Sequence, residues 1–319
     1  MGAGSEAPAG GGVLIGLSAV VMALHGRELV ALTTHGPDGA PGLPFGPFDP
    51  ARHRTFELAL RDFVTAQTGF RPGFVEQLYT FGDAGRDSPR ATPAPDRQRV
   101  VSVGYLALTP DGAEVRPAEA GWTPLNRIFP WEDWREGRPP VIDTVIAPRL
   151  LDWAAADAPR RRGRVDSLFA LPDGTRWNEE RVLERYELLY EAGLAAESAR
   201  DHDVPPDPAA PGLAMTSDHR RILATALGRL RSKLKYRPVL FDLTPATFTL
   251  SELQAAAEAV SGLTLHKQNF RRGVERTGLV EATGRLSAAT GGRPAELYRF
   301  VGADPLAGRA PGLALPGQR

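Results

Sequence analysis

The stretch Leu265-His266-Lys267-Gln268-Asn269-Phe270-Arg271-Arg272-Gly273-Val274 decides how the C-terminal third of the chain is interpreted. In a helix, Phe270 and Val274 share one face, and we expect that face to point toward a core. The remaining surface is basic and polar. Arg and Lys suit guanine, Gln and Asn suit adenine, and phosphates accept basic groups generally. We therefore predict a DNA-reading helix over His266–Thr277, with contacts from Lys267, Gln268, Asn269, Arg271 and Arg272.

The elements expected around this helix follow a specific order. A helix over Asp218–Lys235 and an apolar strand over Val239–Leu243 precede a capping box, Thr249-Leu250-Ser251-Glu252, whose helix ends near Val260. Two strands, Leu279–Thr283 and Ala295–Phe300, follow the reading helix and flank a Gly-rich loop that contains Arg293. This order is typical of a winged helix-turn-helix, in which Arg293 would contact the DNA backbone beside the groove.

Charge is distributed unevenly along a chain of 319 residues whose formal net charge is zero. Residues 213–300 carry 14 Lys and Arg against 7 Asp and Glu, whereas residues 1–212 carry 22 against 30. A basic module behind an acidic one favours nucleic-acid binding by the former. Two alternatives stay open at this point: the basic residues could simply solvate a helix face, or the winged helix could bind another protein.

The N-terminal half predicts a mixed α+β domain. We expect a hairpin of Leu17–Leu24 and Leu29–Thr33, a loop over Pro37–Pro50, a helix over His53–Thr68, and strands over Val75–Phe81 and Val100–Leu108. The apolar run that ends at Leu24 has no preceding Lys or Arg and is too short to span a bilayer, so we interpret it as a buried strand. With no cysteine in the chain, a cytoplasmic location is expected.

The middle of the chain predicts one long amphipathic helix, Asn178–Ser198, with Arg185 on its polar stripe. A proline-rich linker, Asp201–Pro211, follows it. The expected organisation is a flexible tail (1–12), an effector-binding domain (13–155), a helical connector with its linker (156–212), the winged helix (213–300) and a disordered tail (301–319).

Leu43-Pro44-Phe45-Gly46 and the helix that ends at Gly69 resemble the loop–helix–loop of a Nudix box, which implies an α/β/α sandwich for the N-terminal domain. The paired glutamates that hold a divalent ion in that family fall on Ala66 and Gln67, or one residue earlier on Thr65 and Ala66. In either alignment with the Nudix pattern, no carboxylate other than Asp62 falls on a position where a metal ligand is expected. We therefore expect no catalytic residues, no cofactor and no catalytic metal. The alternative is a hydrolase of nucleotide diphosphates that uses Glu57, Asp62 and Glu76.

Together the two halves resemble the Nudix-related transcriptional regulators of NAD metabolism, and the inserted middle is similar to the NadQ branch. The resemblance is carried by the runs Val75–Asp83, Arg231–Pro238, Phe248–Gln254, Asn269–Arg272 and Gly292–Phe300. It implies a repressor of NAD biosynthesis genes that is released from DNA by a nucleotide: ADP-ribose, NAD or an adenine nucleotide. We expect a homodimer on a palindromic double-stranded operator, with no membrane partner.

The segment after Val75 offers the chemistry that such a nucleotide needs, because an adenine favours an aromatic face and a diphosphate favours cations. The predicted effector-binding residues are Tyr79, Phe81, Arg86, Arg90, Arg97 and Arg99. The alternative is that the two aromatic residues belong to the core and the arginines only solvate a loop.

Overall fold

A computed structural model describes residues 13–36, 39–73, 75–82, 99–110, 115, 120–172, 174–287 and 294–302. Its central element is the predicted hairpin, formed by β1 (Val13–His25) and β2 (Glu28–His35). The strands pair antiparallel from Met22 opposite Ala31 to His25 opposite Glu28, and Gly26 takes a positive φ of 60° in the two-residue turn. The hairpin is confirmed, and both of its strands are longer than predicted.

Seven of the described strands build one large sheet around this hairpin, in the order β3-β2-β1-β6-β5, with β4 paired to β1 and β7 to β2. β5 (Val75–Phe81) and β6 (Arg99–Leu108) occur where predicted, and β6 runs parallel to β1. β7 spans Ala120–Pro124. The prediction that Pro37–Pro50 is wholly loop is wrong, since it contains β3 (Pro41–Gly42) and β4 (Phe45–Pro47). Prolines are tolerated there because they lie at the ends of very short strands.

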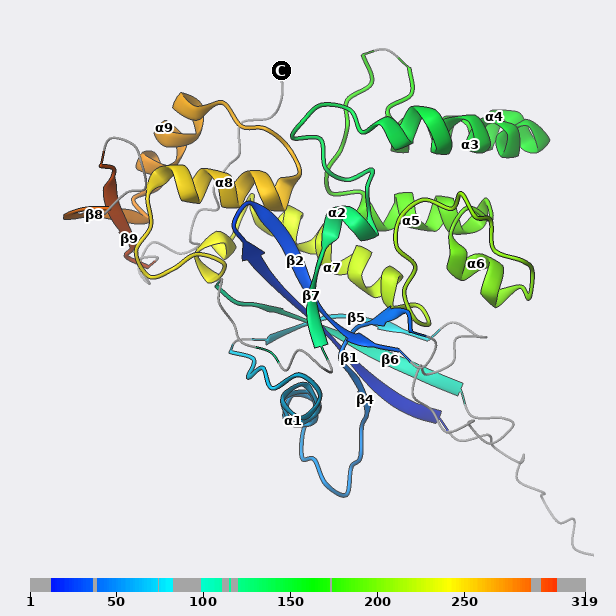
Figure 1. Cartoon of the computed structure of the whole chain (residues 1–319), viewed down its shortest axis with the longest axis horizontal. Coiled ribbons are helices and arrows are strands. Elements are labelled where there is room, and N and C mark those ends of the chain that lie inside the picture. Colours follow the sequence, from blue (N-terminus) through cyan, green and yellow to red (C-terminus); the bar gives the residue numbers. More distant parts are fainter. Residues whose placement is uncertain are drawn as a thin grey trace, which may run out of the picture.

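Helices cover both faces of the sheet, as Figure 1 shows. On one face lies α1 (Phe56–Thr68), which begins three residues later than predicted because Thr55 caps it by accepting from the Leu58 amide. On the other face lies α7 (His219–Lys233), which contacts β1 and β5. Two separate hydrophobic clusters fill these layers, and the predicted α/β/α sandwich is confirmed.

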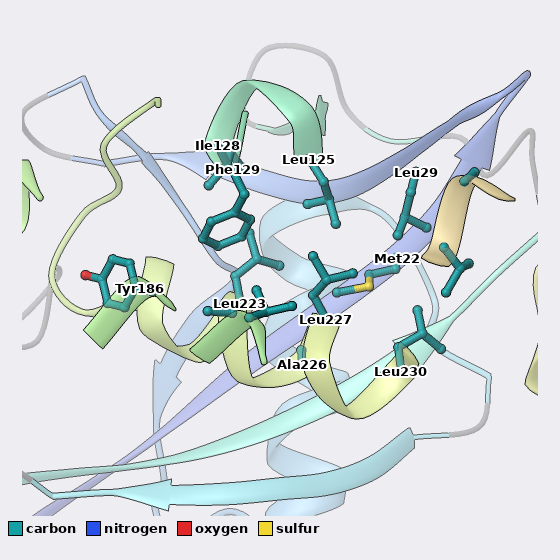
Figure 2. Packing of buried hydrophobic residues seen from close by; sticks show 14 of the residues in the cluster. Met22, Leu29, Leu125, Ile128, Phe129, Tyr186, Leu223, Ala226, Leu227 and Leu230 are labelled. Atoms are coloured by element: carbon teal, nitrogen blue, oxygen red, sulfur yellow. The ribbon is translucent and has the colours of Figure 1, made fainter. Parts of the chain in front are cut away.

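The face of α7 that carries Leu223, Leu227 and Leu230 packs on β1 and on α2 (Leu125–Ile128), and Met22 and Leu125 lie among its neighbours in Figure 2. Each of these leucines is fully buried, which contributes about 1.5–3 kcal/mol per side chain to folding. The same cluster continues into the C-terminal module. One core therefore joins the sheet, α7 and the winged helix.

The predicted helix Asn178–Ser198 is instead two helices, α5 (Val182–Glu191) and α6 (Ala196–Asp201). The break lies at Gly193, which has a positive φ of 73° and therefore ends the first helix. A helical hairpin precedes them. It consists of a π-helical turn (Ile142–Ile146) that leads into α3 (Ala147–Ala154), and of α4 (Ala158–Phe169), which lies beside α3 in Figure 1.

The C-terminal module is a winged helix. The predicted capping box at Thr249 is present, α8 spans Leu250–Ser261, and α9 spans Lys267–Thr277. β8 (Val280–Leu286) and β9 (Glu296–Phe300) form the wing. The expected strand Val239–Leu243 is wrong: Val239–Asp242 forms a 3₁₀ helix, η3, closed by the bond from the Phe241 amide to the Pro238 carbonyl.

A third strand position beside the wing is filled by Phe248. Its amide and carbonyl exchange both backbone hydrogen bonds with Tyr298, at 3.0 and 2.7 Å. Phe248 directly precedes Thr249, the cap of α8, and lies five positions after the expected strand Val239–Leu243. The overall α+β class and the winged architecture are confirmed.

Candidate nucleic-acid interface and effector surface

The two faces predicted for α9 are present. Phe270 is 2% exposed and Val274 is fully buried, both in the large hydrophobic cluster. Because these anchors hold one face, the other is directed to solvent: Lys267, Gln268, Asn269 and Arg272 are exposed and Arg271 is half-buried. A helix so placed in a winged helix can enter a major groove.

Two of the basic side chains on α9 are already oriented by neighbours. The Arg272 guanidinium donates to Asn269 Oδ1 at 2.6 Å, and Arg271 Nη2 donates to Ser251 Oγ of α8 at 3.4 Å. Arg271 Nε is buried and has no hydrogen-bond partner among the described residues. Arg271 thus lies over the N-terminal turn of α8. Arg293 lies outside the described residues.

The predicted effector residues fall in different environments. Tyr79 is 62% exposed, whereas Phe81 is buried in the cluster that contains Ile222 of α7. A Cβ on Gly104 would lie 3.2 Å from the Phe81 ring and 3.4 Å from Ile222, so this side chain is enclosed between sheet and helix. Arg86, Arg90 and Arg97, and the side chain of Arg99, lie outside the described residues.

The three acids of the hydrolase alternative do not converge. Glu57 pairs with Arg61 along α1 at 2.8 Å, and Asp62, 73% exposed, lies 3.4 Å from His53 Nε2. Glu76 pairs with Lys233 of α7, which covers the opposite face of the sheet. Within the described ranges, no group of three or more His, Asp and Glu side chains is placed to hold a metal ion.

Gln67, one of the positions where the Nudix pattern requires a glutamate, has a structural contact. Its amide nitrogen donates to the Phe45 carbonyl at 2.6 Å, and its amide oxygen accepts from the Phe45 amide at 3.2 Å. A carboxylate can accept but cannot donate when ionised. The side chain therefore holds the first residue of β4 against α1 in a way that an ionised glutamate could not reproduce.

A buried ion cluster, which the sequence analysis missed, joins the sheet domain to the winged helix. Glu132 receives hydrogen bonds from Arg185 Nε at 2.6 Å and from Arg231 Nη1 at 2.5 Å. Burial alone would raise the pKa of Glu132, but the two guanidinium charges outweigh it and hold that pKa below its usual value. Arg185 is fully buried, so its placement on a polar stripe is wrong.

This cluster, Glu132–Arg185–Arg231, holds the end of α8. Arg231 Nε donates to the Val260 carbonyl at 2.9 Å, and the Trp134 amide donates to the Gly262 carbonyl at 2.7 Å. Gly262 caps α8 with φ of 70°, and a Cβ there would clash with the Glu132 carbonyl oxygen. The segment around Glu132 therefore sets the position of the helix-turn-helix relative to the sheet.

The described residues contain no helix long and apolar enough to cross a membrane. Their tryptophans contribute mainly to packing: Trp131 is fully buried, and Trp134 lies 4.5 Å from Trp177, centroid to centroid. The Arg185 guanidinium lies over the Trp177 ring at 3.8 Å, which adds a cation–π contact to the ion cluster.

Comparison with known proteins supports both halves of this description. Residues 240–300 match the family described as the NrtR DNA-binding winged helix domain. A relative, the ADPR responsive transcriptional repressor NtrR of Acinetobacter baylyi, is 42% identical over 89 residues, which are 28% of this chain and 35% of the relative. The similarity in sequence thus covers about a third of that protein.

Two solved structures share the fold across nearly the whole chain. One is Shewanella oneidensis NrtR complexed with a 27mer DNA, with a TM-score of 0.52 and 20% identity over 90% of this chain and 93% of that one. The other is a MutT/nudix family protein from Enterococcus faecalis, with a TM-score of 0.53 and 16% identity over 93% and 89%. At such identities the likeness establishes the fold. The chain therefore combines a Nudix fold with an NrtR-type winged helix, and its predicted resemblance to the Nudix-related regulators is confirmed.

Proposed function

We propose that this protein is a ligand-responsive transcriptional repressor that binds operator DNA through α9 and senses a nucleotide in its Nudix-like domain. The observation that carries the proposal is the placement of α9: its apolar face is fixed in the core, and its basic and amide side chains face solvent. The similarity to the ADPR responsive transcriptional repressor of Acinetobacter and to Shewanella NrtR, whose structure is known in complex with DNA, supports the same function.

The DNA contact set consists of Lys267, Gln268, Asn269, Arg271 and Arg272, with Arg293 added from the wing. A homodimer would place two copies of α9 in successive major grooves, on half-sites of a palindromic operator about one helical turn apart. The regulated genes would be those of NAD biosynthesis, and the protein would act in the cytoplasm. Tyr79 offers an exposed ring for the effector, which is ADP-ribose, NAD or an adenine nucleotide.

Regulation needs two conformations that differ in their affinity for both ligand and DNA. The Glu132–Arg185–Arg231 cluster suits this purpose, because it connects the segment after the sheet to α5, α7 and the last turn of α8. A nucleotide that moves the segment around Glu132 would move the helix-turn-helix with it, so the spacing of the two α9 helices would no longer match the operator.

The acids needed for pyrophosphate hydrolysis are dispersed, so we propose that the Nudix-like domain binds its nucleotide without cleaving it and without a catalytic metal. The test of the function is fluorescence anisotropy of a labelled palindromic promoter fragment from an NAD biosynthesis gene. We expect saturable binding that ADP-ribose or NAD reverses. A protein that binds this DNA no better than a scrambled fragment of equal length would contradict the proposal.

A further inference from the structure

A two-lobed cavity lies where the sheet, α7 and the winged helix meet. One lobe, of about 320 Å³, is lined by Leu106, Leu108 and Pro110 at the end of β6. The other, of about 430 Å³, extends past Arg237 to Phe248 and Phe300 of the wing. Five residues line both lobes and make them one site: Glu76, Lys233, Val239, Phe241 and Asp242. Volumes of this size are typical of small-molecule sites.

The first lobe suits a planar apolar ring. Leu106, Leu108, Pro110 and Val239 supply its apolar lining, and Phe241 lines both lobes. The Phe241 ring is fixed by stacking on Phe300 at a centroid distance of 4.3 Å. A rigid aromatic edge beside an aliphatic pocket accepts a flat ring at little entropic cost.

The second lobe and the shared wall carry charge. Lys233 is tied to Glu76, so the Arg237 guanidinium, which is exposed, is the cation open to an anionic group. Asp242 lines both lobes; burial raises the pKa of this carboxyl against the opposing effect of Lys233. A carboxylate between a ring pocket and a guanidinium is placed to accept hydrogen bonds from hydroxyl groups.

We propose that this cavity binds a nucleoside monophosphate, with the base between Leu108 and Val239, ribose hydroxyls at Asp242 and the phosphate at Arg237. The site is separate from the exposed Tyr79 surface and goes beyond the proposed function, because it gives the protein a second small-molecule input. Its walls come from the sheet and from the winged helix, so a bound ligand stabilises the contact between them.

The test is isothermal titration calorimetry of the full chain with AMP, adenosine and inorganic phosphate as separate probes. We expect AMP to bind and phosphate alone not to bind. Arg237→Gln should weaken AMP about tenfold, to the level of adenosine, because it removes the phosphate contact and leaves the ring pocket intact. Asp242→Asn should weaken AMP and adenosine alike.

Arg229→Gln is the matched control, since Arg229 is an exposed arginine of α7 that does not line the cavity, and it should bind AMP as the wild type does. Both lining positions are exposed, so a melting curve that matches the wild type excludes misfolding. No binding of AMP to the wild-type chain, or equal affinity in Arg237→Gln, overturns the site. Neither result touches the repressor function, because DNA binding is measured separately.

Discussion

Arg271 is the side chain of α9 whose loss should affect DNA binding most directly. It is half-buried, and its Nη2 donates to Ser251 Oγ of α8 at 3.4 Å. If it contacts a base edge, Arg271→Ala costs about 1–3 kcal/mol of operator affinity and relaxes specificity at one base pair. Anisotropy titrations against operator variants measure both effects. Arg176→Ala, an exposed arginine outside the winged helix, is the control. Unchanged affinity and specificity in Arg271→Ala would remove it from the contact set.

Glu132 should matter for stability far more than its neighbour Glu136. Glu132→Gln leaves Arg185 and Arg231 buried without their counter-charge, and breaking such a pair costs about 3–5 kcal/mol. Glu136→Gln, an exposed position on the same segment, should be neutral. Urea unfolding measures the difference. If both variants unfold at the same midpoint, the ion cluster does not hold the molecule together.

The same cluster predicts acid sensitivity. The pKa of Glu132 is lowered in the folded chain, so its stabilising contribution is complete above the unfolded value of about 4.5 and is lost as pH falls toward the folded pKa. Wild type should therefore lose stability below about pH 4.5 more steeply than Glu132→Gln. Parallel acid titrations of the two proteins, monitored by circular dichroism, compare the slopes. Equal slopes would show that this carboxylate does not dominate acid unfolding.

Single residues also mark what the sequence could and could not reveal. Phe270 and Val274 could be placed in the core because their spacing is a property of one helix. Glu132, Arg185 and Arg231 could not be paired, since they are 46 to 99 positions apart and each alone is typical of a solvent-exposed side chain. Phe81 was ambiguous for a similar reason: an aromatic residue on a strand looks the same in a core and in a ligand site.

At the level of elements, α8 depends on its docking as well as on its own caps. Gly262 and Gly278 both end helices with a positive φ, 70° and 65°, so alanine strains the backbone about equally at the two sites. A Cβ clashes with the Glu132 carbonyl at Gly262 but meets nothing within 4 Å at Gly278. Gly262→Ala should therefore destabilise the protein clearly more than Gly278→Ala, as thermal unfolding would measure. Equal melting temperatures would contradict the close approach.

Elements with strong local signals were predictable. α8 begins at its capping box, both α8 and α9 end at a glycine with positive φ, and the β1–β2 hairpin follows from a two-residue turn. Elements whose form depends on tertiary contacts were not: Val239–Asp242 is apolar enough for a strand, but Pro238 begins a 3₁₀ turn and Phe248 takes the position beside β9. The break after Glu191 depends on a single glycine that a helical pattern tolerates.

For the whole molecule, electrostatics should govern DNA binding. The basic C-terminal module neutralises phosphates and releases counterions, so log affinity should fall linearly with log salt, by about 0.9 per phosphate contacted. Titrations from 50 to 200 mM salt provide the slope. A flat response would favour a winged helix that binds protein instead of DNA.

The Nudix-like domain should not hydrolyse nucleotides. Incubation of the full chain with ADP-ribose or NAD and Mg²⁺ should yield no product above a buffer control, because Glu57, Asp62 and Glu76 are held apart by separate partners. Chromatography of the mixture detects AMP release. Turnover that disappears in Asp62→Asn would establish the hydrolase alternative.

The most direct test of ligand-responsive repression is the coupling between nucleotide binding and DNA binding. The operator affinity of the full chain is measured by anisotropy with and without saturating ADP-ribose or NAD, and the nucleotide affinity is measured with and without operator. Linkage requires the two ratios to be equal, and a typical coupling is about 5–150-fold. We expect nucleotide to weaken DNA binding by such a factor and DNA to weaken nucleotide binding equally. Tight binding of both ligands at once, with neither affinity changed, would contradict this expectation.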